Sequence, residues 1–119
     1  DLSDIYNYLS DKITTIFIDE ANFLKGNIDV LIDLSINKDL DIFIAGLNLT
    51  SELKPFGIMP EIMAISDEIV LLHASCNDCN RDASYTYYNG SKDSDILVGN
   101  DNYIALCPKC LRKRLTLNK

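Results

Sequence analysis

Three short apolar runs, separated by segments with helical spacing, organise the first two thirds of the chain. The runs at 13–18 (ITTIFI), 41–47 (DIFIAGL) and 69–74 (IVLLHA) are rich in aliphatic, often β-branched, residues and carry few polar ones. Such runs are typical of strands buried on both faces of a parallel sheet, not of amphipathic strands. We therefore predict one parallel strand over each of these three runs.

The segments between the runs have the spacing of short helices. In 27–37 (NIDVLIDLSIN) apolar residues recur near every third or fourth position, and two acids fall on the other side. The segment 60–68 (PEIMAISDE) begins with Pro60, and proline is favoured at the first position of a helix. Alternating strands and helices imply right-handed crossovers and a parallel sheet, so the predicted fold class is α/β.

The pattern changes after residue 74. Residues 83–88 (ASYTYY) alternate and are rich in aromatic side chains, Asn89-Gly90 is a strong turn signal, and 96–98 offers a brief second strand. We predict that these segments form a β-hairpin and that 111–117 forms a basic helix.

Charge divides the chain at about the same place. Residues 1–68 hold 13 acidic and 4 basic side chains, a net charge of −9, whereas residues 69–119 hold 5 acidic and 7 basic ones, a net charge of +2. A first half this acidic argues against nucleic acid as a partner. Nothing at the start resembles a signal peptide, and no apolar run approaches the ~20 residues of a membrane span, so no membrane partner is expected.

All four cysteines stand in two C-x-x-C pairs, Cys76/Cys79 and Cys107/Cys110, with 27 residues between the pairs. Each pair can present two thiolates to one ion from a tight turn, and two pairs complete the tetrahedral four-sulfur shell of a structural zinc site. Two disulfides or four free thiols are the alternatives. A reducing, cytoplasmic setting, which we expect here, favours zinc because paired cysteines usually bind metal there.

A pair of acids follows the first predicted strand. Asp19 and Glu20 come directly after the run that ends in IFI, and ligands of open α/β folds bind at the carboxyl ends of the strands. Asp19 could hold Mg²⁺ that bridges phosphate oxygens, and Glu20 could act as a base toward a hydroxyl or water. The alternative is a strand that simply ends in solvated acids. The phosphate-binding loop G-x-x-x-x-G-K-[ST] does not occur in these residues.

Four stretches of the chain, in order, carry a family resemblance. They are IFIDEANF (16–23), IAGLNLTSELKPFGIMPE (44–61), LHASCNDCNRDASYT (72–86) and ILVGNDNYIALCPKC (96–110). Together they resemble the C-terminal two thirds of a type II thymidine kinase, the zinc-containing cellular and bacterial kind. The resemblance implies part of a P-loop, RecA-like parallel-sheet domain over 1–72, followed by a small zinc-binding hairpin or lasso domain and C-terminal tail over 73–119.

The resemblance also implies roles for single residues. Glu20 matches the general base that takes the proton of the deoxyribose 5′-hydroxyl, and Asp19 matches the aspartate that binds Mg²⁺ with ATP. The residues expected to contact the nucleoside are Phe23, Leu47, Thr86, Ile96 and Tyr103. The expected ligands of the structural zinc are Cys76, Cys79, Cys107 and Cys110.

At the level of the whole protein, the resemblance implies transfer of the γ-phosphoryl group of ATP to the 5′-hydroxyl of thymidine. It also implies feedback inhibition by thymidine triphosphate, a homotetramer and a cytoplasmic location. Because the phosphate-binding loop is missing, we expect this chain to be a truncated portion that is inactive by itself.

Two other functions account for part of the pattern. A zinc-ribbon module that binds nucleic acid or protein through the basic tail would explain the cysteines and residues 112–114, but not the strand that ends in acids. A P-loop ATPase whose Glu20 activates water would explain the acids. Salt-sensitive affinity for DNA or RNA would favour the first, and ATP hydrolysis without nucleoside would favour the second.

Overall fold

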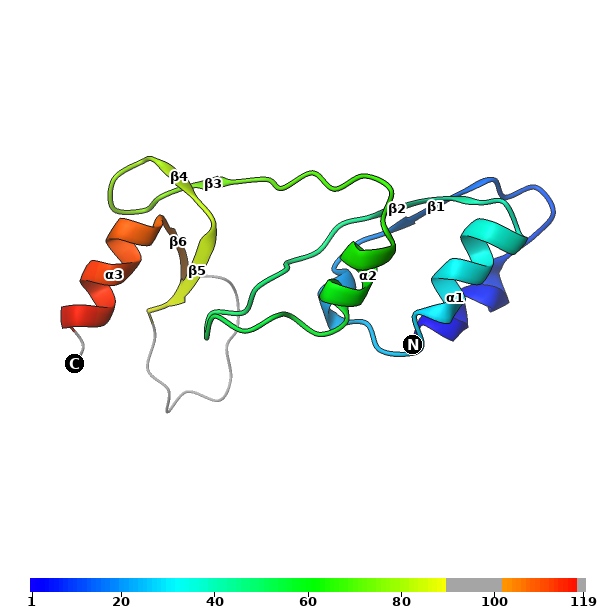
Figure 1. The fold of residues 1–119 in the computed structure, drawn as a ribbon, viewed down its shortest axis with the longest axis horizontal. Helices are drawn as coiled ribbons and strands as arrows, with labels where there is room; N and C mark the ends of the chain where they lie inside the picture. The colour runs from blue at the N-terminus through cyan, green and yellow to red at the C-terminus, as the bar shows by residue number, and fades with distance from the viewer. Residues whose placement is uncertain (90–101, 118–119) are drawn as a thin grey trace. The chain divides into compact units, whose positions relative to one another are not determined.

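A computed structural model describes residues 1–89 and 102–117 of the chain (Figure 1). The chain divides into two compact units. We call the first, Asp1–Asn48 with Pro55–Ile69, the sheet unit, and the second, Leu49–Lys54 with Val70–Lys119, the cysteine unit. Each unit is described by itself below.

A parallel strand pair forms the centre of the sheet unit. Strand β1 (Thr15–Ile18) pairs in parallel with β2 (Asp41–Ile44), in a register that aligns Ile16 with Ile42 and Ile18 with Ile44. This confirms the first two predicted strands, although both are shorter than the apolar runs that predicted them.

Short helices precede and follow the strands of the sheet unit. A 3-10 helix spans Leu2–Tyr8, and α1 (Asp29–Ile32) continues into a π-helical turn over Asp33–Asn37, as the helical spacing of 27–37 predicts. Helix α2 (Met59–Ile65) starts one residue before the predicted Pro60. It ends before the predicted residue 68 because Ser66 has an extended backbone.

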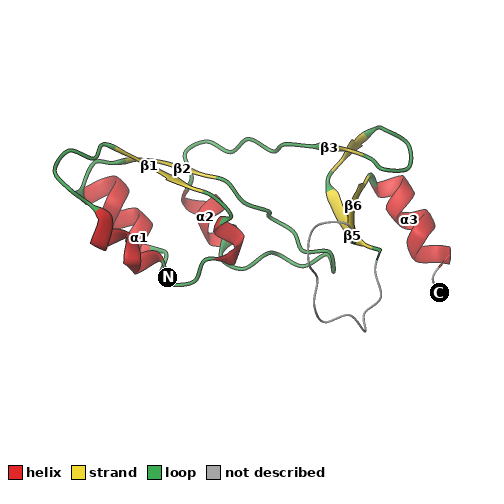
Figure 2. Ribbon diagram, turned by 180° about the vertical axis from the view of Figure 1, so that it is seen from behind, coloured by secondary structure: helices red, strands yellow, loops and turns green. Residues whose placement is uncertain are grey.

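The core of the sheet unit lies on one face of the strand pair. Both ribbon views show α1 and α2 on the same side of β1 and β2 (Figures 1 and 2). The buried side chains of this core all come from helical segments, and Ile16, Ile18, Ile42 and Ile44 pack against them. Buried core residues are Leu2, Ala21, Leu31, Leu34, Met59 and Ile62.

The prediction that these strands are buried on both faces is wrong, because the opposite face of the strand pair is exposed. Phe17 and Phe43 project there, stacked with ring centroids 5.1 Å apart, and they remain 78% and 57% exposed. Because side chains alternate along a strand, one face of each strand packs against helices of the sheet unit and the other carries the two exposed rings. Apolar composition alone therefore overestimated the burial of these strands.

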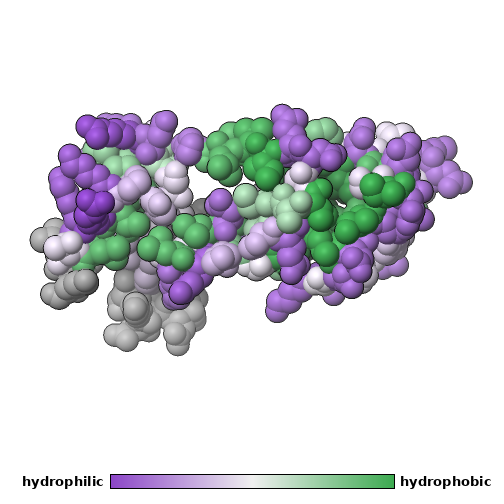
Figure 3. Space-filling model, viewed as in Figure 1, coloured by the Kyte–Doolittle hydropathy of each residue, from purple (hydrophilic) through white to green (hydrophobic). Residues whose placement is uncertain are grey.

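The third predicted strand, over 69–74, is wrong. Residues 69–73 have no regular structure, and their apolar side chains are exposed, from 48% at Ile69 to 87% at Leu72. Figure 3 shows hydrophobic side chains at the surface of this segment between α2 and β3. A strand needs a neighbouring strand for its backbone hydrogen bonds, and within the described residues the parallel sheet has only β1 and β2.

The described residues of the cysteine unit form two small antiparallel sheets and one helix. Strand β3 (Ala74–Ser75) pairs with β4 (Asp82–Ala83), β5 (Tyr85–Tyr88) pairs with β6 (Tyr103–Leu106), and α3 spans Pro108–Leu117. The predicted basic helix is confirmed and begins three residues earlier than expected. The first strand of the predicted hairpin is also confirmed.

The partner of β5 differs from the one that the sequence predicted. Tyr85 pairs with Leu106 and Tyr88 with Tyr103, so β6, directly before the second cysteine pair, is the second strand. The strand expected at 96–98 and Gly90 of the expected turn lie outside the described residues.

The mixture of helices and small sheets is compatible with the α/β class. No helix among the described residues is long and apolar enough to cross a membrane.

Candidate functional site

The turn after β3 and the start of α3 bring the four cysteines of the cysteine unit together. Cys76 follows β3, and the chain turns back so that the Asn80 N–H donates to the Cys76 carbonyl (2.9 Å) and the Cys76 N–H to the Arg81 carbonyl (2.7 Å). Asn80 has a φ of +64°, a left-handed conformation that asparagine tolerates better than most residues. Cys107 follows β6, and Cys110 lies in the first turn of α3.

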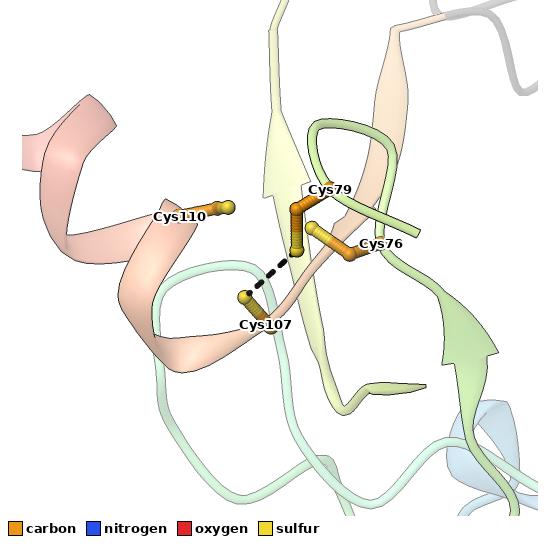
Figure 4. A group of neighbouring side chains, drawn as sticks. All are labelled: Cys76, Cys79, Cys107 and Cys110. Atoms are coloured by element: carbon orange, nitrogen blue, oxygen red, sulfur yellow. Dashed lines mark hydrogen bonds between the residues drawn. The ribbon is translucent and has the colours of Figure 1, made fainter. Parts of the chain in front are cut away.

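The four sulfur atoms have the spacing of one metal-binding site. All of them lie within 4.8 Å of one another, and the Sγ atoms of Cys79 and Cys107 are 3.7 Å apart (Figure 4). A tetrahedral zinc with Zn–S bonds of about 2.3 Å requires sulfur–sulfur separations of roughly 3.8 Å. All four are free thiols. The donor set therefore fits one zinc ion, as the spacing of the cysteine pairs predicts.

Burial and hydrogen bonding act in opposite directions on these thiols. Burial alone would raise the pKa of Cys76, but backbone hydrogen bonds, first among them one from Cys107, outweigh it and lower that pKa to about 6. Burial, with hydrogen bonds to the other cysteines, raises the pKa of Cys110 to about 12. A backbone hydrogen bond from Cys110 is the main cause that lowers the pKa of Cys107 as well. A divalent cation would favour the deprotonated form of all four cysteines, because it stabilises thiolates.

An ion pair lies beside the cysteines. The Arg114 Nε and Nη2 atoms of α3 donate to the Oδ2 and Oδ1 atoms of Asp78, at 2.9 and 2.7 Å. Asp78 stands between Cys76 and Cys79, and Arg114 lies one helical turn after Cys110. The Arg114 guanidinium, followed by the Asn77 amide, holds the pKa of Asp78 at about 2. No local sequence pattern indicates this pair, because the two residues lie 36 positions apart in the chain.

The two acids that follow β1 occupy an edge of the sheet unit. Both are exposed, and the Glu20 N–H donates to the Asp19 Oδ1 at 2.8 Å. Glu20 has a φ of +51°, which costs a non-glycine residue about 1 kcal/mol. Backbone strain of this kind is enriched at functional sites, although Asp39 and Leu53 share the same left-handed conformation outside the predicted site.

Asn22 joins the segments that follow the two parallel strands. Its side chain is buried (4% exposed), and its Oδ1 accepts the N–H of Leu47 at 3.1 Å. Its Nδ2 has no hydrogen-bond partner among the described residues. The Ala21 N–H donates to the Ala45 carbonyl at 3.0 Å and adds a second link. The role of Asn22 could not be predicted from the sequence, because a single amide among apolar residues forms no periodic pattern.

A close backbone approach keeps Asn22 in place. Gly57 has a φ of +51°, and a Cβ there would lie 2.6 Å from the Asn22 carbonyl oxygen. Any side chain at this position would collide with the Asn22 backbone, so only glycine fits.

The other two predicted nucleoside contacts of the sheet unit lie near Asn22. Phe23 is 64% exposed, and its ring meets that of Phe56 edge to face, with centroids 5.4 Å apart. Leu47 is 53% exposed and is held through its backbone N–H by Asn22. The sheet unit thus brings Phe23 and Leu47 to the same end of the strand pair as Asp19 and Glu20.

Two of the remaining predicted contacts lie on the hairpin of the cysteine unit. Thr86 pairs with Ala105, and Tyr103 pairs with Tyr88, their ring centroids 5.1 Å apart. Ile96 lies outside the described residues.

A parallel strand pair whose first strand is followed by two acids, together with a four-cysteine centre, defines an α/β protein with a candidate structural zinc site. A family model described as thymidine kinase matches residues 1–111. The chain belongs to the thymidine kinase family.

Several curated thymidine kinases are similar to the chain over most of its length. That of Porphyromonas gingivalis is 36% identical over 107 residues, which are 88% of this chain and 52% of the relative. That of Pseudothermotoga lettingae is 30% identical over 118 residues, which are 98% of this chain and 64% of the relative. That of Choristoneura fumiferana entomopoxvirus is 36% identical over 111 residues, which are 91% of this chain and 60% of the relative. The chain therefore spans 52% to 64% of the length of these relatives.

Proposed function

We propose that this chain is a truncated portion of an ATP-dependent thymidine kinase, in which Glu20 is the general base. The observation that carries the proposal is the strained backbone of Glu20 at the carboxyl end of β1, directly after Asp19. Family membership supports thymidine and ATP as the substrates.

In the proposed reaction, the Glu20 carboxylate accepts the proton of the thymidine 5′-hydroxyl. The 5′ oxygen then bonds to the γ-phosphorus of ATP as the bond from that phosphorus to the β–γ bridging oxygen breaks, and ADP leaves. Asp19 would hold the Mg²⁺ that accompanies ATP and neutralises charge on the phosphates. An exposed carboxylate suits the role of base, since it needs to accept a proton only as the new bond forms.

The remaining predicted residues would bind the nucleoside and organise the protein. By the family resemblance, Phe23, Leu47, Thr86, Ile96 and Tyr103 would each contact the nucleoside. The four cysteines would hold a structural zinc that supports the hairpin and takes no part in the chemistry. By the family resemblance, we extend the proposal to a cytoplasmic homotetramer that thymidine triphosphate inhibits, with one domain over 1–72 and another over 73–119.

The zinc-module alternative relies on the basic residues 112–114. One of these, Arg114, is already paired with Asp78 inside the cysteine unit. Only part of the basic tail is therefore available for nucleic acid, which weakens that alternative.

The decisive experiment is phosphate transfer from labelled ATP to thymidine, with deoxycytidine as the control substrate. It uses the chain extended upstream to include a phosphate-binding loop. We expect labelled thymidine monophosphate and no labelled product from deoxycytidine. ATP binding without transfer to thymidine would contradict the substrate assignment, and an upstream region without a phosphate-binding loop would contradict the kinase assignment itself.

A further inference from the structure

We propose that Arg114 is a positioning residue that ties helix α3 to the first cysteine pair and to the end of strand β5. Its link to nucleoside binding rests on the proposed function, whereas its effect on zinc retention and on the hairpin does not.

The contact between Arg114 and Asp78 is a bidentate ion pair. Two nitrogen atoms of one planar guanidinium meet both oxygen atoms of one carboxylate, at 2.9 and 2.7 Å. A bidentate pair fixes orientation as well as distance, and lysine cannot reproduce it. The two side chains are only 28% and 29% exposed, so water screens the pair less than it would a fully exposed one.

The Arg114–Asp78 pair connects the two segments that carry the cysteines, so it can affect the geometry of the metal site. Asp78 lies within the turn that carries Cys76 and Cys79, and Arg114 follows Cys110 by four residues, on the same face of α3. The link therefore joins the two halves of the four-sulfur cluster without using a sulfur atom. Groups hydrogen-bonded directly to metal ligands change metal affinity by about 10- to 100-fold when they are replaced. The Arg114–Asp78 pair acts through the turn and the helix that carry the ligands, so we expect an effect at the lower end of that range.

The same guanidinium also reaches the hairpin. Its Nη1 lies 3.4 Å from the Asn89 Oδ1, a long hydrogen bond, and its central carbon lies 5.6 Å from the centroid of the Tyr87 ring. The second distance is within the range of a cation–π contact. The Asn89 N–H donates to the Asn102 carbonyl at 2.6 Å and so continues the β5–β6 ladder. Arg114 thus contacts the strand that carries Thr86, a predicted nucleoside contact.

The test compares Arg114→Lys with Arg112→Lys in the zinc-loaded chain. Arg112 is an exposed arginine two residues earlier on α3, so its variant controls for the substitution itself. We expect Arg114→Lys to raise the rate of zinc transfer to a chromogenic chelator roughly tenfold and to speed amide hydrogen exchange at Tyr87 and Asn89. Equal rates in the two variants would overturn the proposal.

A double-mutant cycle separates the link from general loss of stability. Asp78→Asn should match Arg114→Lys in zinc release, and the double variant should release zinc no faster than either one. Additive effects would show that the two side chains act separately, which contradicts the proposal.

Kinetics of the upstream-extended enzyme test the connection to thymidine. We expect Arg114→Lys to raise the KM for thymidine several-fold while kcat stays near its original value, because binding and not chemistry is affected. A variant with less folded enzyme would instead lose kcat alone, and that result would overturn the link to nucleoside binding. If the unaltered extended enzyme does not phosphorylate thymidine, the proposed function fails, and zinc release and hydrogen exchange still decide the role of Arg114.

Discussion

The interior of the sheet unit and the interior of the cysteine unit are stabilised in different ways. The sheet unit relies on a core of aliphatic side chains on one face of two strands, and it leaves Phe17 and Phe43 exposed on the other. Among the described residues of the cysteine unit, three of the six buried core residues are cysteines. A unit this small has too little apolar surface to fold well by burial alone, and a metal ion can supply what is missing.

The comparison predicts separate responses to loss of metal. Removal of zinc with a chelator, or the substitution Cys107→Ser, should unfold the cysteine unit and leave the sheet unit in place. Structural zinc sites contribute on the order of 10 kcal/mol of folding free energy, so this is the largest effect we expect. In two-dimensional NMR spectra, the amide signals of Tyr85–Tyr88 should collapse while those of Thr15–Ile18 persist.

Zinc added back to the chelated chain is the control, and it should restore the lost signals. Simultaneous loss of both groups of signals would show that the two units fold as one. An unchanged spectrum and unchanged metal content in Cys107→Ser would contradict the assignment of the cysteines as ligands.

The second prediction concerns chemistry, which we place in the sheet unit. In the extended enzyme, Glu20→Gln should lower kcat by about 10²- to 10⁴-fold with thymidine binding retained, because the amide cannot accept the proton. Glu68→Gln, at another exposed glutamate, is the matched control and should leave kcat unchanged. Near-normal turnover of Glu20→Gln would mean that another group is the base.

The third prediction tests the apolar core directly. Leu34 is fully buried, and Leu34→Ala should destabilise the sheet unit by about 2–5 kcal/mol through the cavity it leaves. Ile36→Ala, at a residue that is 73% exposed, is the control and should cost far less. Thermal unfolding followed by circular dichroism measures the loss. Zinc content should stay the same in both variants, and a loss of zinc in Leu34→Ala would contradict the separation of the units.

The contrast between the units also explains which features the sequence could predict. The strands β1 and β2 and the clustering of the cysteine pairs follow from local patterns, since apolar runs and C-x-x-C spacing fix short-range geometry. The predicted strand over 69–74 failed because a strand depends on a distant partner, and composition does not identify that partner. Strand β6 was missed for the same reason: its pairing with β5 is set across the intervening chain.

Side-chain contacts between distant elements could not be predicted from the sequence either. The Asn22 amide that holds Leu47 and the Arg114–Asp78 pair each join residues at least 25 positions apart. Neither Asn22 nor Arg114 stands out by residue type, because asparagine and arginine are ordinary surface residues. Only the fold shows that they bridge two segments.

The smallest predicted effect arises from a polar contact that supplements the core of the sheet unit. The Tyr6 hydroxyl donates to the Asp33 Oδ2 at 2.6 Å. This bond, followed by one from Asn37, lowers the pKa of Asp33, and it also raises the pKa of Tyr6. A carboxyl group with a lowered pKa in the folded state stabilises the fold above its ordinary pKa of about 4, and the contribution is lost as the pH falls through the lowered value. A phenol with a raised pKa contributes below its ordinary value of about 10 and loses that contribution at higher pH.

The contact should therefore stabilise the sheet unit between about pH 4 and pH 10, and Tyr6→Phe should remove that contribution. In the variant, the pKa of Asp33, followed by carboxyl-carbon NMR, should move up toward its ordinary value. Tyr8→Phe, at a tyrosine that is 80% exposed, provides the control and should leave the Asp33 titration unchanged. An Asp33 pKa that does not move in Tyr6→Phe would show that the lowered value comes from Asn37 and its other neighbours, and the polar contact would then add nothing to the apolar core.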